Sequence, residues 1–225
     1  FSYLLKKESD AFRHFKDFYE ISRKLRRNPN AIFFGSHMAP DGDELLIARA
    51  DYGGEFTSND FKEFCLANGI RREFSATATP HQNGVAERNN RTITEMARTM
   101  LLASNLPREL WGEAVMYATY IRNRCIGSNT YGKSPYELFF NEKPVISHIR
   151  IFGCEAYVYV PKTDRDKFES KALVGRLVGY DDQRKCYRIW NPLTRRVIIT
   201  PDVIFDETRF PIVDSLLQDV NFLPD

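Results

Sequence analysis

Apolar and polar positions change their spacing once along this chain, near residue 150. Before that point, stretches with an apolar residue every three or four positions alternate with short continuous apolar runs, a pattern typical of mixed helices and strands. After it, the apolar segments are short, β-branched and aromatic, and turn residues separate them, as in CEAYVYV at 154–160 and ALVGRLVGY at 172–180. The pattern predicts an α/β part followed by an all-β part.

Helix starts in the first part are marked by capping residues as well as by apolar spacing. Either Thr57 or Ser58 can cap a helix that ends near Gly69. Ser134 begins another, because Pro135 suits the first helical position and Glu137 completes a capping box. The predicted helices cover 10–26, 58–69, 85–104, about 108–124 and a segment from 135, and the predicted strands cover 1–5, 44–50 and 70–76.

The second part is most simply a small β-barrel, because its strands are short and no comparable helical pattern interrupts them before Asp214. The chain is accordingly divided into an α/β domain at 1–143, a β domain at 149–208 and a C-terminal tail at 209–225. Helices within 172–200 would contradict this division.

Composition excludes several classes of protein. Apolar residues make up 43% and aromatic residues 13% of the 225 positions, which is enough for a sizeable core. The four cysteines form no CxxC pair, which argues against a structural zinc site. No run of about eighteen apolar residues could cross a membrane. With reduced cysteines and no secretion signal, a nuclear or cytoplasmic location is expected.

The segment at 183–196 is basic, although the net charge of the whole chain is only +2. From 183 to 196 there is no acidic residue, so the basic side chains there can form an anion-binding patch. They are Arg184, Lys185, Arg188, Arg195 and Arg196. Tyr187 and Trp190 lie among them and could stack on bases, but in so small a barrel they are more often core residues.

Two acidic residues stand at the ends of predicted elements. Asp51 closes a predicted strand just before Gly53, and Glu87 lies in the first turn of the predicted helix at 85–104. Carboxylates in such positions can converge across a cleft and bind Mg²⁺ or Mn²⁺. Each residue also has a simple structural interpretation, Asp51 as a turn residue and Glu87 as a partner of the helix dipole.

The sequence around this pair resembles the core of copia-type retrotransposon integrases, which belong to the DDE family of retroviral integrases and many transposases. The motifs are ADYGGEF from Ala50 and NGVAER from Asn83, followed in order by LPRELWGEAV, HIRIFGC and YRIW. Thirty-five residues, 52 to 86, separate Asp51 from Glu87, and this family commonly has that spacing between its second Asp and its Glu. The resemblance therefore implies that Asp51 and Glu87 are catalytic, metal-binding residues.

The resemblance implies an RNase H-like core, a mixed sheet with flanking helices, followed by a small Src-homology-3-like barrel. It also implies metal-dependent cleavage and joining of DNA, with Mg²⁺ or Mn²⁺ as cofactor, DNA as partner and a homo-oligomeric parent enzyme. No membrane or small-molecule partner is expected. The family's first Asp belongs to a strand upstream of Phe1, so this segment alone is expected to hold metal weakly and not to join DNA ends. The alternative is a domesticated or decayed remnant that binds nucleic acid or protein without catalysis.

The helix and loop around Glu87 carry further candidates for DNA contacts. Three arginines share one side of the predicted helix, where they can meet phosphates or form a solvated face with Glu95. Two amide side chains in the preceding loop could contact DNA or serve only the turn. These five candidates are Arg88, Arg91, Arg98, Gln82 and Asn83.

Overall fold

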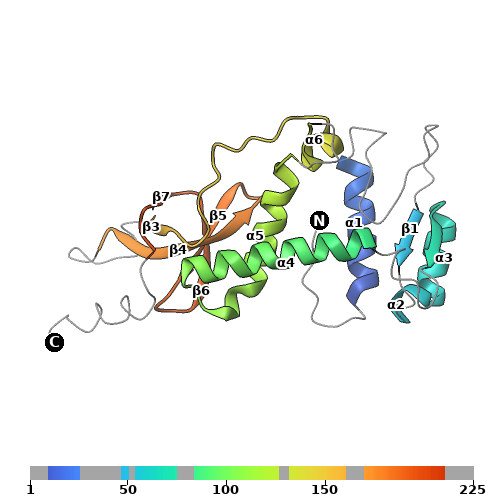
Figure 1. Cartoon of the computed structure of the whole chain (residues 1–225), viewed down its shortest axis with the longest axis horizontal. Coiled ribbons are helices and arrows are strands. Elements are labelled where there is room, and N and C mark those ends of the chain that lie inside the picture. Colours follow the sequence, from blue (N-terminus) through green and yellow to red (C-terminus); the bar gives the residue numbers. More distant parts are fainter. Residues whose placement is uncertain are drawn as a thin grey trace. The chain divides into compact units, whose positions relative to one another are not determined.

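The computed structural model describes residues 10–25, 47–50, 54–74, 84–126, 132–160 and 170–210. The chain forms two compact units, Phe1–Ile93 with Ile121–Val145, and Thr94–Tyr120 with Ile146–Asp225 (Figure 1). The predicted strand at 1–5 and the tail from 211 onward lie outside the described residues. None of the described helices is long and apolar enough to cross a membrane.

The first unit contains a parallel pair of short strands and the helices that join them. Its complete elements are α1 (Ala11–Leu25), β1 (Ile47–Ala50), α2 (Gly54–Thr57), α3 (Asn59–Ala67), β2 (Arg71–Phe74) and α6 (Pro135–Phe140). β1 and β2 pair in parallel, which requires a crossover between them, and α2 and α3 supply it. Ser58 rather than Thr57 caps α3, because its hydroxyl accepts the backbone N–H of Phe61 at 3.2 Å. These elements confirm the α/β class predicted for the first part.

Aromatic rings form the core of this unit. Phe12 and Phe15 of α1 meet Phe61 of α3 edge to face, with ring centroids 5.5 and 5.1 Å apart. Tyr19 and Cys65 are buried beside them. Such edge-to-face pairs stabilise the contact beyond simple area burial. The aromatic face of α1 is therefore the face that packs on α3.

The second unit contains a five-stranded antiparallel sheet of order β6-β5-β4-β3-β7. The strands are β3 (Glu155–Tyr159), β4 (Ala172–Asp181), β5 (Cys186–Asn191), β6 (Arg196–Thr200) and β7 (Val203–Asp206). The pairing of β4 with β5 shifts register between Leu177 and Gly179, an irregularity that bends a strand. No helix occurs between 172 and 200, so the prediction of an all-β second part is confirmed.

Both faces of this sheet are partly covered. One face holds a core that includes Ala156, Leu177 and Ile189, all fully buried. On the other face Arg176 and Trp190 are buried, and helix segments of the same unit pack there (Figure 1). Those segments belong to α4 (Gly84–Ser104), the 3-10 helix η3 (Arg108–Leu110) and α5 (Trp111–Arg124). The sheet and residues 94–120 therefore share one compact unit, while the predicted domain boundaries at 143, 149 and 208 remain a prediction.

Candidate nucleic-acid interface

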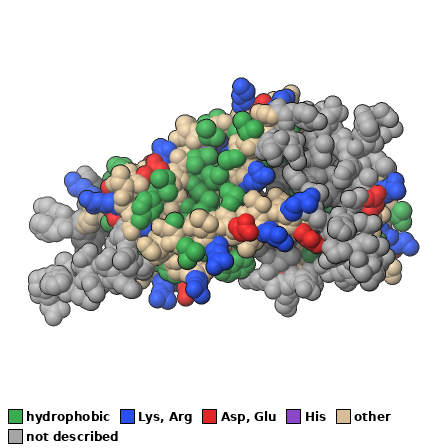
Figure 2. Space-filling model, in the orientation of Figure 1, with side chains coloured by type: hydrophobic (Ala, Val, Ile, Leu, Met, Phe, Trp, Pro, Cys, Tyr) green, Lys and Arg blue, Asp and Glu red, His purple; other side chains and the backbone are tan. Residues whose placement is uncertain are grey.

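Helix α4 buries one side and exposes the opposite side. Ile93, Ala97 and Ser104 are buried, and their spacing of four and seven residues places them on one stripe. The opposite side is charged and exposed, and in Figure 2 acidic and basic side chains alternate along it. Its charged residues are Glu87, Arg88, Arg91, Glu95 and Arg98. The three arginines therefore lie on the same side of the helix as Glu87, as the sequence predicted.

This charged side is close to neutral. Three arginines and two glutamates leave a net charge of +1 (3 − 2). Glu87 precedes Arg91 by four residues and Glu95 precedes Arg98 by three, spacings at which opposite charges attract on a helix. Among the described residues, however, none of the three arginines has a carboxylate within ion-pair distance. Their exposed guanidinium groups are therefore available to phosphates, although a solvated face fits the same geometry.

Only part of the predicted metal site lies in the described residues. Glu87 is exposed in the first turn of α4, where the helix dipole favours a negative charge. Asp51, Gln82 and Asn83 lie outside the described residues. Within the described ranges, no group of three or more His, Cys, Asp or Glu side chains could hold a metal ion. Glu87 is therefore the one predicted metal ligand whose position the structure gives.

The basic segment at 184–196 does not form one patch. β5 runs through its middle and pairs antiparallel with β4 and with β6, so the two connecting turns lie at opposite ends of β5. A six-residue strand separates its ends by about 17 Å. Arg184 and Lys185 lie at one end, and Arg195 and Arg196 lie at the other. The single patch expected from the sequence is therefore two separate groups, because the sequence cluster is longer than the strand.

Arg188, in the middle of β5, forms an ion pair with a carboxylate of the same unit. Its guanidinium donates two hydrogen bonds to the carboxylate of Glu113 on α5, at 2.8 and 2.5 Å. This pairing raises the pKa of Arg188, since Glu113 favours the charged form. Gly179 leaves room for the pair, because a Cβ there would lie 3.2 Å from the Cδ of Arg188. Arg188 therefore links the sheet to α5, a role that its position in a basic segment concealed.

Tyr187 and Trp190 belong to the core. The ring of Tyr187 packs edge to face on Phe205, at 4.8 Å between centroids, and contacts the cluster around Ile189. Trp190 lies on the other face of β5 and is only 4% exposed. Both rings pack within the protein, which favours the structural interpretation of these two aromatic residues.

Arg176 is a structural residue that sequence reasoning missed. Its side chain is fully buried, and it donates hydrogen bonds to the carbonyl of Gly153 at 2.5 Å and to that of Ser104, the last residue of α4, at 3.0 Å. Burial lowers its pKa, and nearby Glu155 partly opposes that effect. The sequence did carry a signal for this role, because Arg176 is the single charged residue inside the apolar run ALVGRLVGY. An Arg buried in such a strand needs hydrogen-bond acceptors from neighbouring elements.

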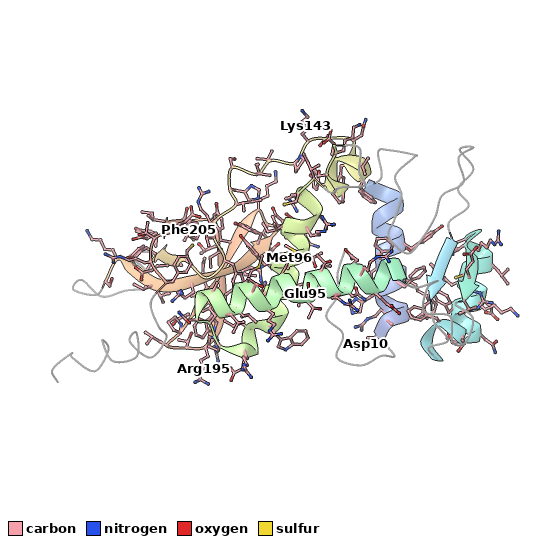
Figure 3. All side chains as sticks on the ribbon, in the orientation of Figure 1. Asp10, Glu95, Met96, Lys143, Arg195 and Phe205 are labelled. Atoms are coloured by element: carbon pink, nitrogen blue, oxygen red, sulfur yellow. The ribbon has the colours of Figure 1, made fainter. Side chains whose placement is uncertain are left out.

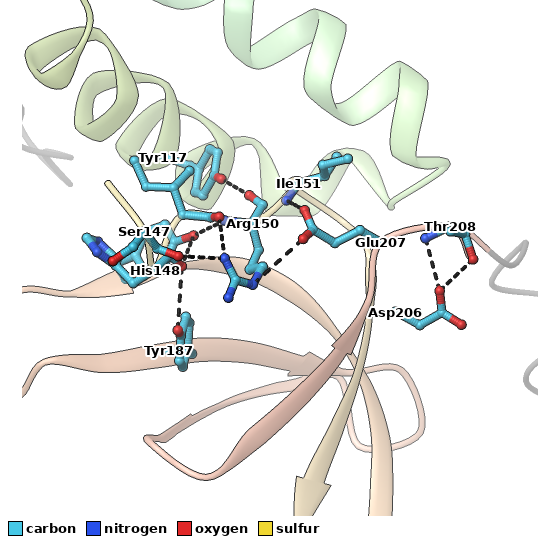
Figure 4. A network of polar contacts seen from close by, with 11 residues as sticks. Tyr117, Ser147, His148, Arg150, Ile151, Tyr187, Asp206, Glu207 and Thr208 are labelled. Atoms are coloured by element: carbon cyan, nitrogen blue, oxygen red, sulfur yellow. Dashed lines mark hydrogen bonds and ion pairs between the residues drawn. The ribbon is translucent and has the colours of Figure 1, made fainter. Parts of the chain in front are cut away.

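A polar network also fixes the segment before β3 to the sheet (Figure 4). The hydroxyl of Tyr180 accepts the backbone N–H of Arg150 at 2.7 Å and donates to the carbonyl of His148 at 3.3 Å. Tyr117 of α5 donates to the carbonyl of Arg150, and Glu207 accepts the N–H of Ile151 at 2.8 Å. Burial raises the pKa of Tyr180 to about 12, so its hydroxyl stays protonated at neutral pH. The motif HIRIFGC thus coincides with a tightly held connection.

Comparison with known proteins shows which proteins this chain is related to. The retroviral polymerase SH3-like domain family matches residues 154–218, which include all five strands of the sheet. The chain is 37% identical over 92% of its length to the retrovirus-related Pol polyprotein from transposon TNT 1-94 of Nicotiana tabacum. It is 31% identical over 90% of its length to the corresponding polyprotein from transposon RE2 of Arabidopsis thaliana. The chain is therefore related to Pol polyproteins of copia-type retrotransposons, and the expected resemblance is confirmed.

The chain spans only 14% of the length of either plant polyprotein. Among solved structures, it is similar to the HTLV-2 integrase catalytic core domain in complex with magnesium. That similarity has 23% sequence identity and a TM-score of 0.39, and it covers 60% of this chain and 72% of the other.

Proposed function

We propose that this chain is integrase sequence of a retrotransposon Pol polyprotein, whose parent enzyme inserts the DNA copy of the element into host DNA. The reaction class is metal-dependent cleavage and joining of phosphodiester bonds. Two lines of support are the similarity to Pol polyproteins over most of the chain and the spacing of Asp51 and Glu87. The substrate and partner are DNA, and the parent enzyme acts as a homo-oligomer.

The observation that carries this proposal is the charged side of α4. It presents Glu87 at the start of the helix and Arg88, Arg91 and Arg98 within the next three turns, all exposed. Carboxylate oxygens are the ligands that Mg²⁺ prefers, and guanidinium groups bind phosphate oxygens. One surface of one helix therefore offers both a metal ligand and groups that hold the DNA backbone.

Each residue has a distinct role in this proposal. Asp51 and Glu87 hold the metal ion, with Mg²⁺ or Mn²⁺ supplying charge neutralisation at the reacting phosphate. Arg88 and Arg91 bind neighbouring phosphates and orient the DNA beside Glu87. Gln82 and Asn83, in the loop that precedes α4, contact the same DNA segment. The exposed basic residues at the ends of β5 add backbone contacts that do not depend on base sequence.

Glu87→Gln tests the proposal directly. Because the substitution removes a charged metal ligand but keeps the side-chain shape, it should lower Mg²⁺ and Mn²⁺ affinity at least about tenfold, the loss seen even for outer-shell residues. Isothermal titration calorimetry of the 225-residue chain bound to duplex DNA would measure the change. Metal binding by this segment is expected to be weak, so Mn²⁺ is the better probe.

Glu95→Gln is the matched control for this experiment. Glu95 lies on the same helix, is also exposed and carries the same charge. If both substitutions lower metal affinity equally, the effect is one of general charge and Glu87 has no special role. If Glu87→Gln leaves both metal affinity and DNA binding unchanged, Glu87 is not a metal ligand, and the remnant that lacks catalysis is favoured instead.

A further inference from the structure

The two turns at the ends of β5 have the same construction. In the β4–β5 turn, the side-chain oxygen of Asp181 accepts the backbone N–H groups of Gln183 and Arg184, at 3.1 and 3.0 Å. In the β5–β6 turn, the side-chain oxygen of Asn191 accepts those of Leu193 and Thr194, at 2.9 and 3.3 Å. Each turn has four residues, 182–185 and 192–195, and each ends on a residue with positive φ.

That last position holds a basic residue in both turns. Lys185 and Arg195 each have φ of 53°, the left-handed conformation that glycine and asparagine adopt most readily. A long side chain is strained there, so glycine would give a more stable turn in either place. Both side chains are exposed and make no ion pair with any described residue. An ion pair within the described fold therefore does not explain the basic residue at either position.

The two turns differ in charge. Counted with the strand residue on either side, the β4–β5 turn (181–186) has zero net charge (2 − 2), because Asp181 and Asp182 offset Arg184 and Lys185, and the guanidinium of Arg184 lies 4.0 Å from the carboxylate of Asp181. Counted in the same way, the β5–β6 turn (191–196) contains no acid, so Arg195 and Arg196 give it a charge of +2. A phosphate backbone is attracted to uncompensated positive charge. Only the β5–β6 turn provides it.

The β5–β6 turn is also preorganised for contact. Pro192 is buried and fixes the first turn residue, while Leu193 at the tip is 51% exposed. In Figure 3 Arg195 lies at the lower margin of the second unit, away from the labelled Phe205 of β7. A rigid turn loses little conformational freedom on binding, and an exposed Leu can rest against a sugar.

We propose that the β5–β6 turn, through Arg195 and Arg196, is the site where this sheet binds the DNA backbone, and that the β4–β5 turn is not. The inference rests on the proposed DNA-binding function and makes it specific. Of five basic residues that form one cluster in the sequence, two carry the interaction. Arg188 is held by Glu113, and Asp181 and Asp182 offset the net charge of Arg184 and Lys185.

The test compares Arg195→Gly with Lys185→Gly. Both substitutions remove one positive charge from a left-handed turn position, so neither should lower the unfolding temperature. Fluorescence anisotropy with a labelled duplex, repeated at several salt concentrations, gives the slope of log affinity against log salt. Each lost phosphate contact reduces that slope by about 0.9. The expected reductions are one contact for Arg195→Gly, two for Arg195→Gly with Arg196→Gln, and none for Lys185→Gly.

Each outcome decides between the alternatives. If Lys185→Gly reduces the slope as much as Arg195→Gly does, both turns bind and the inference is wrong. If neither turn variant changes the slope but Arg91→Gln does, DNA is bound at α4 alone, so the inference fails while the proposed function stands. A wild-type chain that binds no duplex even at low salt would overturn both.

Discussion

Arg188 lies in a basic segment of the sequence, yet its charge is used within the protein. Two of its nitrogens donate to Glu113, and the two side chains are only 29% and 21% exposed. A bidentate pair of this kind is stronger than an exposed surface ion pair. Loss of one partner leaves the charge of the other partly desolvated and without a counter-charge. The position of a basic residue in the sequence therefore does not show whether its charge is available to DNA.

Neutralising the pair separates its structural role from DNA binding. Arg188→Gln or Glu113→Gln alone should lower the free energy of unfolding by about 1–3 kcal/mol, because a half-buried partner loses its hydrogen bonds. The double variant should cost less than the sum of the two, since it leaves no unpaired charge. Urea unfolding would measure all three. Because the double change conserves net charge, it should leave duplex affinity unaltered. A loss of affinity would show that Arg188 itself contacts phosphates.

At the scale of elements, local signals predicted most of what the structure contains. Ser134 accepts the backbone N–H of Glu137 at 3.1 Å, and α6 begins at Pro135 as the capping pattern indicated. α4 begins one residue before the predicted start and ends at the predicted Ser104. These features depend on neighbours within a few residues, and such neighbours are visible in the sequence.

Long-range contacts were not predictable in this way. Arg176 reaches the carbonyl of Ser104, seventy-two residues earlier in the chain. The division of the basic segment between the two ends of β5 follows only from antiparallel pairing with both neighbours. A repeating apolar pattern shows that a strand exists, but not which element covers it. The basic cluster was visible in the sequence, and its separation into two groups was not.

Gly153 shows how closely the chain before β3 approaches the end of α4. It has φ of +78°, and a Cβ there would lie 2.2 Å from the Cβ of Ser104. Gly153→Ala should therefore lower the free energy of unfolding by about 1–2 kcal/mol for the backbone conformation. The clash should add about 1–3 kcal/mol. Gly132→Ala is the matched control, since Gly132 has φ of +76° and nothing within 4 Å of the added Cβ. Equal losses in thermal unfolding would contradict the close approach.

At the scale of the whole molecule, the compact units do not follow the change of apolar spacing near residue 150. The match to the retroviral polymerase SH3-like domain begins at residue 154. The compact unit that contains this sheet also includes 94–120, the second half of α4 and the first part of α5. Arg176 and Arg188 connect the two sequence segments through Ser104 and Glu113. The sheet face that carries Arg176 and Trp190 is buried, which explains why these helix segments belong to the same compact unit as the sheet.

The sheet should consequently depend on those helix segments for its stability. A segment comprising 94–225 contains the whole second unit and should unfold in one cooperative urea transition, followed by far-ultraviolet circular dichroism. A segment comprising 146–225 lacks the partners of Arg176 and Arg188 and uncovers the face on which Trp190 lies. Buried polar groups without partners cost about 1–3 kcal/mol each, and a small domain has only about 5–15 kcal/mol of stability to lose. The shorter segment should therefore unfold at a clearly lower urea concentration, over a broader range. If both segments unfold at the same midpoint with the same steepness, the strands form an independent domain, as the predicted boundaries at 149 and 208 would have it, and the helices are only neighbours.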